Sequence, residues 1–166
     1  MTSPVSENDR IRGYLQQQAL KPIEDLISRA EEGIQELTAA AKAVPDADLD
    51  VTVAGETWTP MDCIRHAAGW NMRGAQAVLY VAHTGALPPG EETPLPSSRD
   101  EILARHREAI DSLYAHVRDA DPQAFLDVKW QHPFFGDLNW REWLLFLRIH
   151  AKDHARQLTT MTGALD

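Results

Sequence analysis

Apolar residues recur at intervals of three and four in four stretches of the chain, which is the period of an amphipathic α-helix. These stretches cover about residues 22–44, 60–83, 99–118 and 140–161. A shorter segment, 8–20, could form a separate N-terminal helix, although Gly13 weakens it. No strong strand signal is present, because segments 51–53 and 125–130 are long enough only for local extension. The pattern therefore predicts an all-α fold.

Residues that favour helix ends stand at several of the predicted boundaries. Thr59 is a good N-cap and is followed by Pro60, which suits the first helical position. Asn139 followed by Glu142 resembles a capping box, in which each residue bonds the backbone of the other. Gly163 is expected to end the last helix. These signals support helices that begin near residues 60 and 140.

The connection at residues 85–97 is long and contains four prolines. Its thirteen residues, if extended, reach about 40 Å, whereas a helix of twenty residues is about 30 Å long. The connection can therefore cross a whole bundle. We expect the second and third long helices to run parallel on either side of this crossover.

Composition narrows the class of protein. The chain has 166 residues, 43% of them apolar, which predicts one core and a single domain over residues 1–166. No run of eighteen apolar residues is present, so we expect no membrane span. The polar segment 1–10 shows no secretory signal, and Cys63 is the only cysteine, so we expect a cytoplasmic protein. The net charge of −9 argues against a nucleic-acid-binding surface.

Two histidines on the last predicted helix share one face, because His150 and His154 are four residues apart. This spacing suits two adjacent positions around a metal, but such pairs are common without one. His66, on the apolar stripe of the second long helix, is the third candidate ligand. Trp70 shares a face with His66 and is expected to wall the pocket. The segment from His150 to His154 lacks the glutamate of the zinc-protease motif, which argues against that class.

The remaining histidines and the cysteine have other expected roles. His132 precedes a proline in a loop and is expected to line the pocket mouth. We expect His106 to be structural, and His83 and His116 to be solvated. Cys63 lies one turn before His66 and is expected to pack as a small apolar residue.

The chain resembles the DinB/YfiT-like superfamily over about residues 23–161. The resemblance rests on motifs at residues 58–66, 132–136, 140–143 and 150–158. It implies an up-down-down-up four-helix bundle with a long crossover, in agreement with the connection described above. It also implies that one histidine of the second helix and two of the fourth bind a divalent metal. These positions are His66, His150 and His154.

Three imidazoles leave an open fourth position on a metal, as in catalytic zinc sites. We expect one divalent ion, zinc or nickel. The resemblance links the family to low-molecular-weight thiols such as bacillithiol, mycothiol and glutathione. It therefore favours a metal-dependent thiol S-transferase, whose partners would be a small-molecule thiol and an electrophile. A metal-dependent hydrolase and a non-catalytic metal- or ligand-binding stress protein remain alternatives, and a homodimer is left open.

Overall fold

Five α-helices, one 3₁₀ turn and one short hairpin make up the computed structural model, which describes residues 3–90 and 93–166. In chain order they are α1 (Glu7–Gln18), α2 (Ile23–Ala43), η1 (Asp46–Asp48), α3 (Pro60–Thr84), α4 (Arg99–Val117), β1 (Trp130–His132), β2 (Gly136–Leu138) and α5 (Trp140–Leu165). The four long helices closely match the predicted ones, and α1 is the predicted N-terminal helix. Within the described ranges, no helix is long and apolar enough to cross a membrane.

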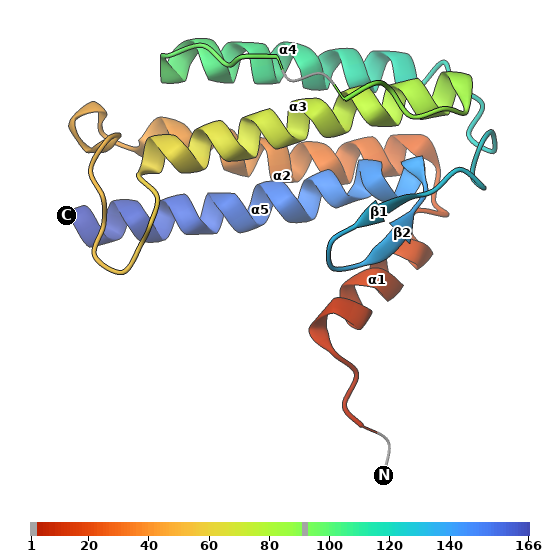
Figure 1. Ribbon diagram of the computed structural model, residues 1–166, viewed down its shortest axis with the longest axis horizontal. Helices are drawn as coiled ribbons and strands as arrows, with labels where there is room; N and C mark the ends of the chain where they lie inside the picture. Colours follow the sequence, from red (N-terminus) through yellow and green to blue (C-terminus); the bar gives the residue numbers. More distant parts are fainter. Residues whose placement is uncertain (1–2, 91–92) are drawn as a thin grey trace.

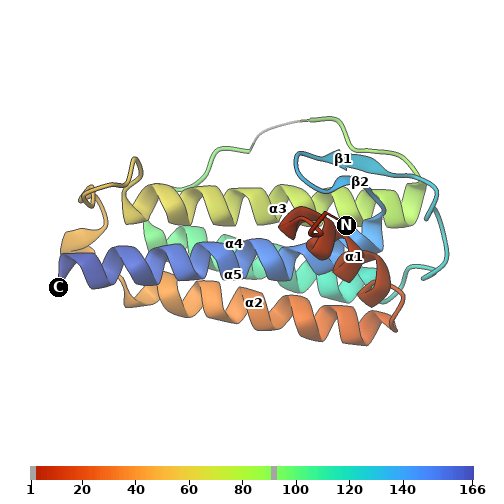
Figure 2. The same cartoon turned by 90° about the horizontal axis from the view of Figure 1, so that it is seen from below.

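The four long helices form an up-down-down-up bundle (Figures 1 and 2). Helix α5 packs against both α2 and α3, and α4 packs mainly against the other side of α3. Helices α3 and α4 run parallel, and the chain between them returns along the outside of the bundle. The structure thus confirms the predicted crossover, of which residues 91 and 92 lie outside the described part. Leu95 holds this segment to α3, where it approaches Gly69.

The capping residues act as the sequence predicts. The side chain of Thr59 accepts a hydrogen bond from the backbone of Asp62, and that of Asn139 accepts one from Glu142. Both acidic side chains bond back to the capping residue, so α3 and α5 each begin with a capping box. The prediction that Gly163 ends the last helix is wrong, because α5 continues to Leu165. Leu165 packs against the core, and this contact outweighs the glycine.

The hairpin was not predicted. It pairs Trp130 with Leu138 and His132 with Gly136 in antiparallel register, and three-residue strands are too short to show an alternating pattern. Side chains of α5 hold it in place: the rings of Trp130 and Trp143 stack with centroids 5.3 Å apart. The Trp143 Nε1 also donates to the Trp130 carbonyl at 3.3 Å. The hairpin thus lies against the first turns of α5.

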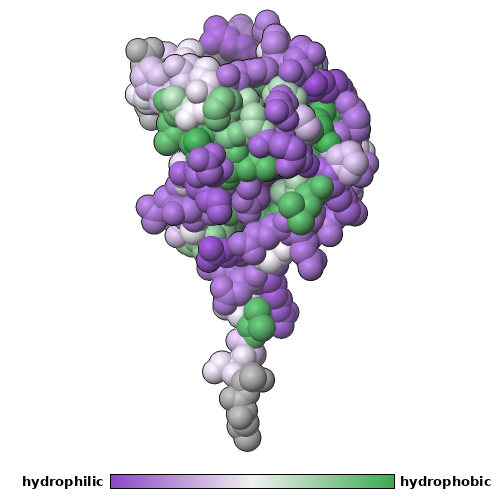
Figure 3. Space-filling view, turned by 90° about the vertical axis from the view of Figure 1, so that its right-hand side faces the viewer, coloured by the Kyte–Doolittle hydropathy of each residue, from purple (hydrophilic) through white to green (hydrophobic). Residues whose placement is uncertain are grey.

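The bundle end that carries the hairpin is mostly hydrophilic, and its apolar side chains appear as separate patches (Figure 3). Arg141, in the first turn of α5, is buried, and its guanidinium donates to three backbone carbonyls. Two of these belong to Ala19 and Lys21, in the link from α1 to α2, and the third belongs to Pro122. Arg141 therefore ties α1 and the segment before the hairpin to the start of α5.

Helices α2 and α5 approach each other closely at Gly33. A Cβ atom there would lie 2.7 Å from the carbonyl oxygen and 2.9 Å from the Cα of Arg148. Ion pairs flank the contact, since Lys152 bonds Glu36 at 2.9 Å and Glu32 at 3.1 Å, and Arg148 also pairs with Glu32. The contact fixes α5 two residues before His150.

Replacing Gly33 by Ala should destabilise the fold, because the added methyl meets backbone that cannot rotate away. We expect a loss of roughly 1–3 kcal/mol in the free energy of unfolding, which urea denaturation followed by circular dichroism would measure. Gly13→Ala is the matched control, because a Cβ there meets nothing within 4 Å. It should leave stability unchanged or raise it by up to about 1 kcal/mol. Equal stability of the two variants would contradict the close contact.

Candidate metal centre

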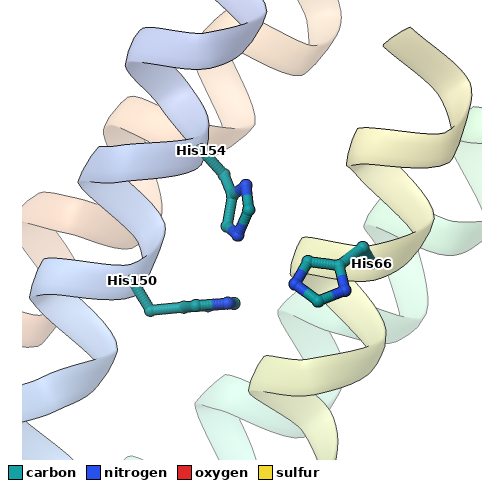
Figure 4. Close-up of side chains that lie close together, drawn as sticks. All are labelled: His66, His150 and His154. Atoms are coloured by element: carbon teal, nitrogen blue, oxygen red, sulfur yellow. The ribbon is translucent and has the colours of Figure 1, made fainter. Parts of the chain in front are cut away.

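Three histidine side chains converge between α3 and α5 (Figure 4). His66 projects from α3 toward His150 and His154, which stand one turn apart on α5. One nitrogen from each ring lies within 4.8 Å of those of the other two. The ring centroids are 4.5 Å apart for His150 and His154, and 4.9 and 5.7 Å from His66 to His154 and His150. The three rings named from the sequence thus form one cluster.

His150 is held by a buried hydrogen-bond relay that crosses three helices. Its Nδ1 lies 2.9 Å from the side-chain oxygen of Asn71 on α3. The amide nitrogen of Asn71 lies 3.1 Å from Nε2 of His106 on α4. Since an amide oxygen only accepts, the proton of His150 must be on Nδ1, and the lone pair is on Nε2. The relay therefore leaves His150 Nε2 available as a ligand, and His106 takes the structural role expected of it.

A hydrogen bond to a side-chain amide oxygen also orients the ring of His154. Its Nδ1 lies 3.0 Å from the side-chain oxygen of Gln157, which can only accept, so Nε2 again carries the lone pair. Cys63 lies behind this ring, with its Sγ 3.5 Å from the Gln157 oxygen and 3.7 Å from His154 Nδ1. Burial raises the pKa of the Cys63 thiol to about 12. Cys63 is therefore a protonated, packed side chain outside the cluster.

Burial favours the neutral form of two rings of the cluster, those of His66 and His150. Burial lowers the pKa of His150 to about 3 and that of His106 to about 4. Burial also lowers the pKa of His66, and the neighbouring His154 adds to this effect. A neutral imidazole is the form that binds a metal.

Trp58 covers the side of the cluster nearest the start of α3. Its ring centroid lies 4.8 Å from that of His66, and it stacks over His154 at 6.4 Å. Residues Trp58, Asn71 and Gln157 were not predicted as site residues. Trp58 and Gln157 fall within the motifs that carry the family resemblance, whereas Asn71 had no signal except its position next to Trp70.

A cavity of about 350 Å³ opens beside the three histidines. The predicted pocket residues Trp70 and His132 both line it, and the ring of Trp70 lies 4.3 Å from that of His150. Its other lining residues include Pro133, Phe134, Phe135, Phe146, Ile149 and Asp153. Phe146 is four residues before His150 and Asp153 is three after it, so both share its helix face. Most of the wall is apolar, and Asp153 supplies a carboxylate at its rim.

The other two histidines stand apart from the cluster. His83 and His116 are exposed near the far ends of α3 and α4, and the Nε2 of His83 lies 3.0 Å from the carbonyl of His116.

The donor set fits a divalent metal ion. Three imidazoles offer nitrogen lone pairs from two rigid helices, and nitrogen is a ligand that several such ions prefer. Outer-shell hydrogen bonds fix the orientation of His150 and His154, as is usual for ligating histidines. An ion held by these three rings would keep room for a further ligand, and the cavity lies beside the rings.

Comparisons with known proteins agree with this fold. The family description of the DinB superfamily matches residues 29–158, which is most of the chain. The structure also resembles a crystal structure of TT2238, a four-helix bundle protein, with a TM-score of 0.64 and 25% sequence identity. The match covers 84% of this chain and 99% of that one. No curated protein sequence matches the chain. The extent of the family match shows that the chain belongs to the DinB superfamily.

Proposed function

We propose that this protein is a metal-dependent thiol S-transferase, which joins a low-molecular-weight thiol to an electrophile. The observation that carries the proposal is the set of three converging histidines beside a largely apolar cavity. His66, His150 and His154 would hold one divalent ion, zinc or nickel. A free thiol with a pKa of about 8.5 is only a few per cent ionised at pH 7, and coordination to such an ion would supply the thiolate at neutral pH.

The ligands and walls of the cavity suit this chemistry. Because all three ligands are uncharged, the loaded site keeps the positive charge of its ion and favours an anionic sulfur. The rings of Trp70 and Phe146 offer an apolar surface for the body of the electrophile. Cys63 does not act as a nucleophile, since its thiol is buried and its pKa is raised to about 12.

Asp153 supports hydrolysis as a second candidate function. From the sequence, the site had no carboxylate base, yet Asp153 lines the cavity next to His154. Its side chain is largely exposed and pairs with Arg156 at 3.3 Å. A carboxylate there could accept a proton from a water molecule that attacks an ester or amide.

We expect about one divalent ion per chain in untagged protein purified without added metal, measured by elemental analysis. His150→Ala or His154→Ala should abolish tight binding, because two ligands hold an ion far more weakly than three. His83→Ala is the control and should keep it. Full metal occupancy in the His66→Ala, His150→Ala double variant would refute the assignment.

The relay through Asn71 should strengthen metal binding. Asn71→Leu removes the acceptor that orients His150, so we expect zinc affinity to fall roughly 10- to 100-fold, measured by competition with a chelating dye. Asn71→Asp keeps an acceptor for the Nδ1 proton and should retain most of the affinity. If the leucine variant bound zinc as tightly as the aspartate variant, the relay would have no part in binding.

Metal-loaded protein should consume free thiol when it is incubated with a panel of low-molecular-weight thiols and a generic electrophile. The rate should depend on metal, vanish in His154→Ala and survive Cys63→Ala. Hydrolysis of an ester or amide without thiol transfer, lost in Asp153→Asn, would favour the hydrolase. If neither reaction occurs, the binding-protein alternative gains support.

A further inference from the structure

His132 has one ring nitrogen that is used by its own hairpin turn. The side chain is only 4% exposed. Its Nδ1 accepts hydrogen bonds from the backbone N–H groups of Phe134 at 3.0 Å and Phe135 at 3.3 Å. Two donors that point at one nitrogen require that this nitrogen carries a lone pair and no proton.

The other ring nitrogen of His132 must therefore carry the proton. In the neutral ring this is Nε2–H, and it has no hydrogen-bond partner among residues 3–90 and 93–166. A ring in this state can donate a hydrogen bond but cannot accept a proton, because its lone pair is occupied by the turn. His132 is therefore a hydrogen-bond donor in the cavity wall and not a general base.

The surroundings of His132 are aromatic. Its ring stacks on Phe135 at 4.5 Å and meets Phe146 edge-on at 4.4 Å. Trp70, which bridges toward the metal centre, lies 6.3 Å from His132 and 4.3 Å from His150. All of these residues line the same cavity, and Phe134 at its mouth is 70% exposed. A polar donor set among aromatic walls is typical of a ligand site, in which the donor fixes the orientation of the ligand.

We infer that the cavity binds a neutral, largely apolar molecule with one acceptor oxygen, such as a ketone, which accepts a hydrogen bond from His132 Nε2–H. The assignment of this molecule as the electrophile rests on the proposed function, whereas the hydrogen bond itself does not. His132 would then be a specificity-determining residue for carbonyl-containing substrates.

The test compares two probes of the same shape, acetophenone and α-methylstyrene, in which a CH₂ group replaces the carbonyl oxygen. Their affinities for zinc-loaded protein without thiol are measured by calorimetry. His132→Asn is the informative variant, because its side-chain oxygen replaces Nδ1 as acceptor for the turn, while no atom replaces Nε2. It should weaken acetophenone binding roughly two- to tenfold and leave α-methylstyrene binding unchanged.

His132→Gln is the matched opposite, because its amide nitrogen reaches the position of Nε2 but nothing replaces Nδ1. It should lower the midpoint of thermal unfolding and keep the acetophenone affinity. In the unmodified protein, the ¹⁵N resonance of His132 Nε2 should shift with acetophenone and not with α-methylstyrene. The inference would be overturned if the ¹⁵N resonance did not shift or if acetophenone did not bind. It would also be overturned if His132→Asn lost equal affinity for both probes. If the binding results are as expected but no thiol transfer occurs, only the proposed function is contradicted.

Discussion

The hydrogen bond between His150 Nδ1 and the Asn71 oxygen is the interaction on which the site depends. A buried imidazole needs a partner for its N–H, and the choice of partner decides which nitrogen is left for a ligand. Asn71 can serve His150 only because its own amide is held by His106. These residues come from α5, α3 and α4, so the candidate metal centre needs all three helices in register.

The topology provides that register. The crossover makes α4 parallel to α3, so that His106 meets Asn71 from the side of α3 opposite α5. On the side of α5, the backbone contact at Gly33 fixes how closely α5 packs against α2. The capping box at Asn139 fixes the residue at which α5 begins. The apolar packing of the bundle thus positions groups whose chemistry is polar.

The sequence predicted the parts of this arrangement that have a local signature. The helices follow from apolar periodicity, the crossover from its length, and the face shared by His150 and His154 from their spacing. The roles of Asn71 and Gln157 could not be predicted from the sequence, because each depends on a side-chain rotamer. The role of Asn71 also depends on the position of α4 along α3, which brings His106 within reach. The hairpin was not predicted because three-residue strands are too short to show an alternating pattern. Gly163 gave a wrong helix end because the packing of Leu165 against the core extends α5 beyond it.

The three candidate ligands also belong to distant parts of the chain, since more than eighty residues separate His66 from His150. Contacts over such a separation form late in folding, because a long loop must close first. His66 cannot join the other two candidate ligands until α3 and α5 have paired, and α5 is synthesised after α3. A partly folded chain therefore offers no three-histidine set, and any tight metal binding that needs all three rings would occur only once α3 and α5 have paired.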